Sequence, residues 1–238
     1  MAEHGDHSLE DRIIAIAREA LEAGRPLPGE PGLSRVLGVS RPALRETMAR
    51  LEQDGLFVRR RGAGTMVNPG AFDVEVRFDQ QAEFADLLAE AGYEPTVELI
   101  ERSLVALREH DAEVLHRATG TPAVRSVKRW RADDRAAMVA VDIVPVPSSR
   151  VDDVMAAEVG LFQLIRDVLG ESLEWELAWP AAVATTARLS AWLEVPVKTA
   201  LMSLDLIGIS RGGQRVYRAR EYIVPGIIRS GFVRTVRS

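Results

Sequence analysis

The sequence predicts an α+β protein made of two parts: an N-terminal helical domain closed by a β-hairpin, and a C-terminal domain built on a mainly antiparallel sheet with helices. Three observations carry this prediction. Apolar residues recur at helical spacing up to about residue 54. A glycine-containing turn at 61–64 separates two short runs of β-forming residues. After the chain-breaking segment Asn68-Pro69-Gly70, strand-like runs alternate with short helices.

Composition limits the classes of function. The 238 residues are 47% hydrophobic and include no cysteine, which excludes disulfides and thiolate chemistry. No stretch approaches the roughly 20 apolar residues of a membrane span. The first ten residues are polar and acidic, so we expect no signal peptide and a cytoplasmic protein. The four histidines are scattered, and we expect neither a metal site nor a cofactor.

Three helices are expected in the N-terminal part, at 9–21, 30–37 and 41–53. Apolar residues recur every three or four positions in each helix, and Val36 is expected to face inward with its leucine neighbours. Ser40 precedes the third helix and is a residue type typical of a helix N-cap. The short connection between the second and third helices is typical of a helix-turn-helix.

The charge distribution indicates a nucleic-acid partner although the net charge is −5. Residues 41–61 hold six arginines against three acidic residues, which makes a local basic stripe. On the third helix, Arg41, Pro42 and Arg45 lie beside the apolar stripe and are expected to face outward toward double-stranded DNA. The hairpin is expected to act as a wing, with phosphates contacted by Arg59, Arg60 and Arg61 and a small tip at Gly62 and Gly64. An arginine-rich surface that only contacts solvent remains the alternative.

The C-terminal part is expected to form a sheet from six runs rich in β-forming residues, namely 96–107, 123–130, 136–144, 173–184, 200–209 and 216–224. Helices are expected at 80–91, 111–118, 161–169 and 186–193. A weak repeat joins two halves, each with a helix, a hairpin and a carboxylate before a Val-Pro pair. This repeat predicts that Asp142 and Glu221 occupy related places on one sheet.

The segment from Leu27 to Val67, LPGEPGLSRVLGVSRPALRETMARLEQDGLFVRRRGAGTMV, resembles the winged-helix signature of the GntR family of transcriptional regulators. The resemblance implies that Ser40, Arg41, Pro42 and Arg45 contact the major groove and phosphates, and that Gly64 lies at the minor-groove tip. One position departs from the family pattern. The arginine that usually follows the motif glutamate is Pro31 here, so a customary contact of the second helix is lost.

The C-terminal part resembles the HutC branch of that family, whose effector domain is called UTRA. The landmarks are Gly92, Gly120-Thr121-Pro122, Arg129-Trp130-Arg131, Leu161-Phe162 and Arg220-Glu221-Tyr222. The resemblance implies a chorismate-lyase-like fold that binds a small-molecule effector through Arg129, Arg131, Asp142 and Glu221. Gly160 and Ile227 replace a customary serine and tyrosine, which disfavours a phosphosugar ligand. Trp130, Trp175 and Trp179 are candidates for a more apolar lining.

Simpler interpretations of these residues stay open. Alternating arginines on a strand suit a face in contact with solvent, and tryptophans on a sheet are more often core residues than a ligand platform. Asp142 and Glu221 also suit strand ends. The predicted domains are a winged helix-turn-helix at 1–69, a linker at 70–78 and a sensing and dimerisation domain at 79–238.

Together these patterns predict a homodimeric, ligand-responsive transcriptional repressor, with the linker near 67–75 as the transmission element. A constitutive dimeric DNA-binding protein with a filled C-terminal core is the first alternative. An enzyme is the second, because the resembled fold has a catalytic relative. The sequence shows no nucleophile-base pair and no phosphate-binding glycine loop, so we predict that the protein is not an enzyme.

Overall fold

The computed structural model describes residues 8–60, 64–74, 76–77 and 82–234. It divides into two compact units: residues 1–80 together with 229–238, and residues 81–228. The predicted second domain, 79–238, includes the segment 229–234, which the structure groups with the first unit instead. None of the described helices is both long and apolar enough to span a bilayer.

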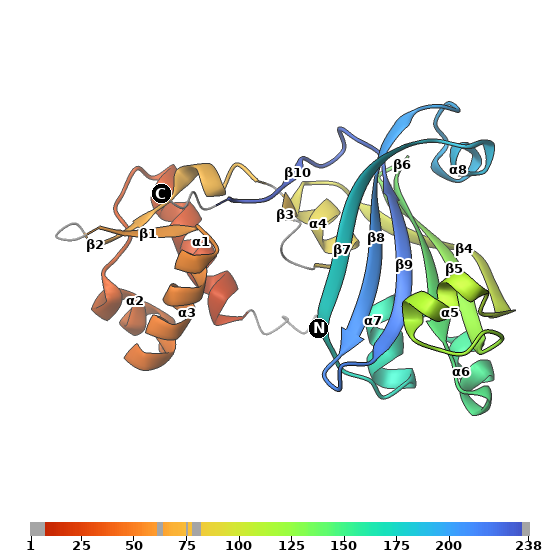
Figure 1. The fold of residues 1–238 in the computed structure, drawn as a ribbon. Helices are drawn as coiled ribbons and strands as arrows, with labels where there is room; N and C mark the ends of the chain where they lie inside the picture. The colour runs from red at the N-terminus through yellow and green to blue at the C-terminus, as the bar shows by residue number, and fades with distance from the viewer. Residues whose placement is uncertain (1–7, 61–63, 75, 78–81, 235–238) are drawn as a thin grey trace. The chain divides into compact units, whose positions relative to one another are not determined.

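The first unit holds three helices and a hairpin: α1 (Leu9–Glu22), α2 (Glu30–Leu37), α3 (Arg41–Gln53), β1 (Phe57–Arg60) and β2 (Gly64–Val67) (Figure 1). Local chemistry explains where the helices begin. Ser8 and Asp11 form a reciprocal capping box at the start of α1, and the Ser40 hydroxyl accepts a hydrogen bond from the Ala43 N–H at the start of α3. Gly38 ends α2 in the left-handed conformation that glycine adopts without strain.

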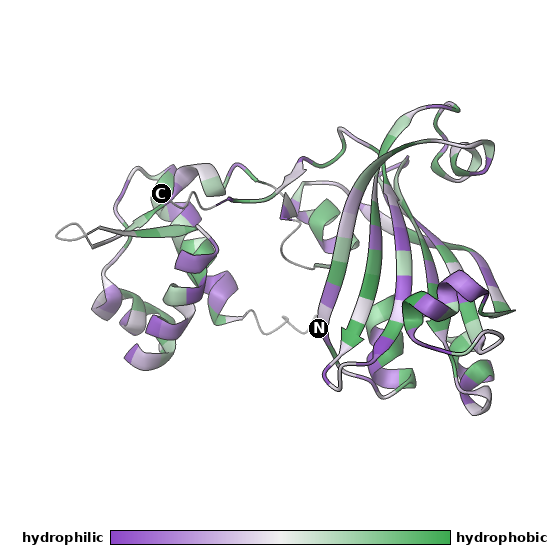
Figure 2. Ribbon diagram, viewed as in Figure 1, coloured by the Kyte–Doolittle hydropathy of each residue, from purple (hydrophilic) through white to green (hydrophobic). Residues whose placement is uncertain are grey.

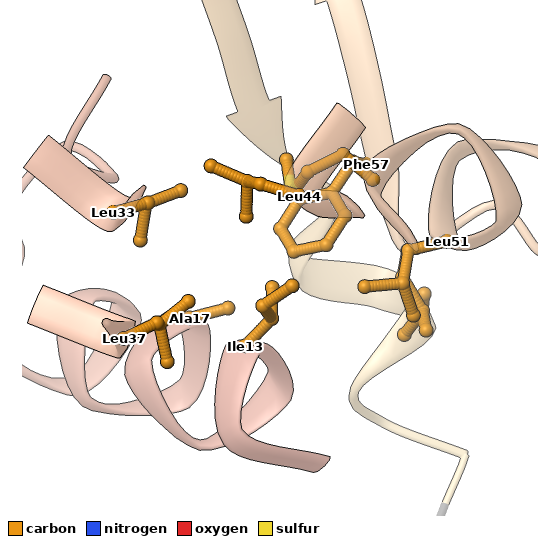
Figure 3. Close-up of a cluster of buried hydrophobic side chains, with 10 residues drawn as sticks. Ile13, Ala17, Leu33, Leu37, Leu44, Leu51 and Phe57 are labelled. Atoms are coloured by element: carbon orange, nitrogen blue, oxygen red, sulfur yellow. The ribbon is translucent and has the colours of Figure 1, made fainter. Parts of the chain in front are cut away.

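Apolar side chains from all three helices and the hairpin meet in one core (Figure 3). Ile13, Leu44 and Leu51 have no exposed surface, and Phe57 closes the core from β1 with 1% exposed. The expectation that Val36 faces inward was wrong, because its side chain is 69% exposed. The short helix α2 buries a single stripe made by Leu33 and Leu37, and Val36 lies outside that stripe.

The C-terminal segment joins the first unit through a short parallel pairing. After the 3-10 turn η1 (Pro69–Ala71), strand β3 (Val76–Arg77) pairs with β10 (Ser230–Gly231). Val233 then packs against the core of the three helices. Gly55 has a φ of +76°, and a Cβ on it would lie 2.7 Å from Cγ1 of Val233. A glycine at position 55 therefore permits both the turn after α3 and the close approach of the C-terminal segment.

The second unit is built on a six-stranded antiparallel sheet in the order β4-β5-β6-β9-β8-β7. Its strands are β4 (Pro95–Ala106), β5 (Pro122–Ala132), β6 (Arg135–Pro145), β7 (Leu173–Ala184), β8 (Ala200–Ser210) and β9 (Arg215–Ile223). Hydrophobic and hydrophilic residues alternate along much of this sheet (Figure 2), as expected when a sheet has two different environments. The predicted α+β class, with a mainly antiparallel C-terminal sheet, is confirmed.

Helices cover both faces of this sheet. One face carries α4 (Phe84–Glu90), α6 (Val151–Ala156), α7 (Leu161–Gln163) and the π-helical turn η3 (Leu164–Val168), and the other carries α5 (Glu109–Leu115) and α8 (Ala187–Leu193). The single-turn η2 (Ser148–Arg150) leads into α6. Within the second unit, the segment α5-β5-β6 and the segment α8-β8-β9 have the same order of one helix and two strands. Strands β6 and β9 pair where these two segments meet. This is the repeat that the sequence predicted.

Candidate functional sites: a nucleic-acid-binding face and an acidic cluster

The N-terminal end of α3 presents an exposed basic surface. Arg41, Pro42 and Arg45 are all exposed, while Leu44 and Met48 of the same helix are buried. One side of α3 therefore packs on the core, and the first helical turn of the opposite side is exposed. A recognition helix contacts base edges with residues in this position. Ser40 lies exposed at the helix start, where its hydroxyl is used as the cap.

Arg45 is held in place by a neighbouring helix. Its Nε lies 2.7 Å from Oε2 of Glu30, the first residue of α2, and the Arg45 side chain is still 66% exposed. The contact raises the pKa of Arg45 through the hydrogen bond with Glu30. Glu30 uses one edge of the guanidinium group, which leaves the remaining N–H donors free to point outward. Pro31 lies in the first turn of α2, where a missing N–H costs no helical hydrogen bond.

The predicted wing is described only in part. On the backbone, Arg59 and Arg60 of β1 pair with Thr65 and Gly64 of β2. The remaining predicted wing residues, Arg61 and Gly62, lie outside the described residues.

A second candidate site lies in the C-terminal unit, on the sheet face that α4, α6 and α7 cover. Asp142 on β6 pairs in register with Ser126 on β5 and with Ala219 on β9, and Glu221 pairs with Ala140. Since directly opposed residues of antiparallel strands share a face, Asp142 and Glu221 lie on the same face of adjacent strands. The structure thus brings these two predicted residues together.

Asp142 is buried together with a single lysine. Nζ of Lys128 lies 3.6 Å from Oδ2 of Asp142, and the two side chains are 8% and 4% exposed. Burial raises the pKa of Asp142, and the charge of Lys128 opposes that shift. Arg102 on β4 donates from Nε to the Ser126 hydroxyl at 3.3 Å, and its Nη1 donates to carbonyl groups at the end of α6.

Tyr217 and Glu176 extend the site toward β7. The Tyr217 hydroxyl donates a hydrogen bond to Oε1 of Glu176, and the ring of Tyr217 is fully buried edge-on to Phe162 at 6.3 Å between ring centres. Burial raises the pKa of Glu176. Glu221 lies between these groups: burial, followed by the carboxylates of Glu176, Asp142 and Glu83, raises its pKa to about 8.

The structure places Arg129 and Arg131 on the opposite face of the sheet. Arg129 pairs in register with Glu98 of β4, one position away from Lys128. Both arginines bind Glu98 and Glu194, and Arg129 also donates to the Trp192 carbonyl at 3.0 Å. These contacts link β5 to the neighbouring strand β4 and to the C-terminal end of α8. The four predicted effector residues therefore do not form one cluster.

The two outer tryptophans lie apart from the acidic face. Trp175 and Trp179 are 68% and 51% exposed on β7, which is an edge strand, so within this chain they do not line an enclosed cavity. Trp130 is partly buried and shares the face of Lys128, since the two residues are two positions apart on β5.

Sequence reasoning missed the participation of Lys128, Glu176 and Tyr217 in the acidic cluster. The sequence did contain one signal for Lys128. Successive residues of a strand point to opposite faces, so Lys128 and its neighbour Arg129 must lie on different faces of the sheet. For Glu176 and Tyr217 the decisive information is the pairing of β7, β8 and β9, in which Glu176, Gly208 and Tyr217 fall in one row. A single sequence does not contain that register.

Two family models match the chain over most of its length. Residues 7–67 match "Bacterial regulatory proteins, gntR family", and residues 90–226 match "UTRA domain". The chain belongs to the gntR family of regulators that carry a UTRA domain. The predicted family and fold are thereby confirmed, and this family consists of regulators rather than enzymes.

Curated relatives support the same family. The HTH-type transcriptional regulator GgaR of Escherichia coli strain K12 is 32% identical over 152 residues, which is 64% of this chain and 59% of GgaR. The putative L-lactate dehydrogenase operon regulatory protein of E. coli K12 is 48% identical over 58 residues, or 24% of this chain and 22% of that protein. The matched part of this chain therefore spans less than two thirds of the length of these relatives.

Solved structures share the fold along most of the chain. The possible transcriptional regulator YydK of Bacillus subtilis has a TM-score of 0.68 at 15% identity, covering 97% of this chain and 100% of YydK. PhnF of Mycobacterium smegmatis has a TM-score of 0.61 at 18% identity, covering 93% of this chain and 100% of PhnF. At these identities the likeness concerns the fold alone.

Proposed function

We propose that the protein is a cytoplasmic transcriptional repressor that binds double-stranded operator DNA through its first unit. This proposal rests mainly on the exposed first turn of α3. There Arg41 and Arg45 face outward, and Glu30 orients the Arg45 guanidinium group. Guanidinium groups in this position meet guanine edges or phosphates when a recognition helix enters the major groove. The gntR-family match over residues 7–67 supports this proposal.

The proposed active form is a homodimer. A single winged helix makes few base contacts, so two copies on a two-fold operator supply the affinity and specificity that one lacks. The edge strand β7 offers an interface: Trp175, Leu177 and Trp179 alternate along one side of it and are 68%, 38% and 51% exposed. Exposed apolar residues on an unpaired strand edge are a surface that proteins ordinarily cover. We propose that a second copy of this chain packs against this surface of β7.

The proposed control is a small-molecule effector in the second unit, at the acidic cluster made by Lys128, Asp142, Glu176, Tyr217 and Glu221 on one face of the sheet. The UTRA match over residues 90–226 supports an effector at this unit. The two units are joined twice by the chain, once before residue 81 and once after residue 228. A shift in the second unit therefore has two covalent routes to the DNA-binding unit, the predicted linker and the segment that leads to β10.

A genomic selection tests the proposal. Fragmented DNA from the source genome is incubated with the full chain, and retained fragments are sequenced. We expect fragments upstream of genes to be enriched and to share a two-fold symmetric sequence. Recovery without any common sequence would contradict operator recognition. The same selection with Arg45→Ala is the control, and it should lose the enrichment.

A further inference from the structure

We infer that the second unit holds a binding site for a small monocarboxylic acid with an apolar chain, in addition to the proposed effector site. The site is a cavity of about 410 Å³ at the end of the sheet where β5 begins and β6 ends, near the labels α5 and α6 in Figure 1. Small-molecule sites in proteins have volumes of roughly 300–1,000 Å³. The described residues that line this cavity include no member of the acidic cluster.

Most of the cavity wall is apolar. It is made largely by six side chains from the strand ends, from β9 and from the end of η3, namely Pro122, Pro145, Val146, Val168, Leu169 and Val216. These segments are far apart in the sequence, so the wall forms only when η3 is packed at this end of the sheet. An apolar wall stabilises the hydrocarbon part of a ligand, because contact removes both surfaces from water.

Two arginines, Arg117 and Arg150, also line the cavity. Arg150 in η2 donates from Nη2 to the Val168 carbonyl group, and its Nε lies 3.0 Å from Oδ2 of Asp153. Among the described residues, Nη1 of Arg150 has no hydrogen-bond partner. A guanidinium group carries five N–H donors, so Arg150 keeps donors for a ligand while its other contacts hold it in place.

Arg117 is half-buried and, among the described residues, has no carboxylate partner. Its Nη1 lies 3.3 Å from the His116 carbonyl oxygen and 3.4 Å from Oε1 of Gln214, and its Nη2 lies 3.5 Å from the Arg215 carbonyl oxygen. These distances exceed the range of about 2.7–3.2 Å of ordinary N–H···O hydrogen bonds, so the donors of Arg117 are weakly satisfied.

The absence of a carboxylate partner distinguishes Arg117 from several other half-buried arginines of the second unit. Each of these binds a carboxylate of the same chain: Arg125, Arg129, Arg131 and Arg218. Hydrogen bonds between a guanidinium group and a carboxylate are stronger than those to neutral oxygens, and the two planar groups match each other. An external carboxylate in the cavity would therefore supply the partner that Arg117 lacks.

The other polar residues of the wall favour a single negative charge. Glu171 lines the same cavity, and among the described residues it forms an ion pair with neither arginine. Its carboxylate repels a second anionic group, so the wall suits a monocarboxylate better than a dianion. Ser148 is exposed on the wall and adds a hydroxyl donor. The carboxylate end of the ligand is thus placed at the arginines, and its chain lies against the apolar wall.

A matched series of small probes tests the charge and the chain. The full-length protein is heated at pH 7.5 and constant ionic strength with hexanoate, acetate, hexylamine, 1-hexanol or inorganic phosphate. Tryptophan fluorescence follows the second unit, because all four tryptophans lie in it. We expect hexanoate to raise the Tm of this unit by about 3–5 °C at ten times its dissociation constant. The other probes lack the chain, lack the negative charge or carry the opposite charge, so each should raise the Tm by less than about 1 °C.

Three variants show where hexanoate binds. Arg117→Gln removes a guanidinium group, and Ser148→Trp fills the cavity from an exposed position, so both should abolish the rise in Tm. Arg211→Gln is the control and should keep the rise, because Arg211 is an exposed arginine that does not line the cavity. If Arg117→Gln fails to fold, Ser148→Trp decides the question, since it retains both arginines of the wall.

Three outcomes would overturn the inference: no rise with hexanoate, an equal rise with any of the other probes, or a rise of undiminished size in Ser148→Trp. Loss of the rise in Ser148→Trp together with its retention in Arg211→Gln would support it. DNA binding measured without any probe tests the proposed function separately, because that function does not depend on this cavity.

Discussion

Gly208 and Tyr217 face each other on adjacent strands at van der Waals contact. A Cβ built on Gly208 would lie 1.9 Å from Cε1 of the Tyr217 ring, closer than any real contact. Gly208 pairs in register with Tyr217 on β9 and with Glu176 on β7. The glycine thus leaves room for a buried tyrosine to lie across β8 and to reach Glu176 with its hydroxyl group.

Replacing that glycine should destabilise the second unit. Gly208→Ala is expected to lower the free energy of unfolding by about 2–3 kcal/mol, because the Tyr217 ring or the strand must move. Denaturant unfolding monitored in the second unit measures the loss. Gly212→Ala is the matched control, since its Cβ would meet only the Ser210 hydroxyl at 3.7 Å, an ordinary contact. Equal stability of the two variants would contradict the close packing of Tyr217 on Gly208.

The raised pKa of Glu221 predicts a pH-dependent stability. In the folded protein this carboxyl group keeps its proton up to a pKa of about 8, whereas in the unfolded chain it loses the proton near pH 4. The folded state therefore binds more protons between these values, and the stabilisation that this provides is lost as the pH rises toward 8. Relative to Glu221→Gln, the wild type should lose roughly 2–3 kcal/mol between pH 5.5 and 8.5. Parallel pH curves for the two proteins would show that Glu221 titrates normally.

If the exposed edge strand β7 forms the dimer interface, a charged residue introduced on it should weaken the dimer. Trp179→Asp should shift the protein toward the monomer, because a carboxylate would be buried unpaired at the proposed interface. Sedimentation velocity at micromolar concentration measures the change. Leu104→Asp, on the other edge strand and 52% exposed, is the control and should stay dimeric. If Trp179→Asp remained dimeric and Leu104→Asp dissociated, the interface would involve β4 instead.

The packing of the C-terminal segment should contribute to the stability of the first unit. Val233→Asp should destabilise that unit by about 1–3 kcal/mol, because Val233 packs on the core of the three helices. Hydrogen exchange of α1 and α3 in the full chain measures the loss. Phe232→Asp is the neighbouring control, since Phe232 is 56% exposed. Unchanged exchange in Val233→Asp would mean that this segment contributes nothing to the fold of the first unit.

Strands and helices were largely predictable because local chemistry determines them. The strand at Leu173–Ala184 was expected at those residues, and Ser40 was expected as the cap of α3. Arrangements that depend on pairing between distant segments were not predictable. The register of β5 with β4 decides that Arg129 meets Glu98 on one face while Lys128 meets Asp142 on the other. The pairing of β10 with β3 likewise has no local signal, because each strand is two residues long.

DNA recognition by α3 is tested most directly by the affinity of the full protein for the intergenic DNA beside its own gene, measured at two salt concentrations for the wild type and for Arg45→Ala. We expect tight binding that weakens steeply with salt, and a loss of affinity of about 10- to 100-fold in Arg45→Ala. Arg211→Ala, an exposed arginine of the second unit with an 82% exposed side chain, should bind like the wild type. Binding that is insensitive to both salt and Arg45→Ala would contradict the assignment of α3 as the helix that reads DNA.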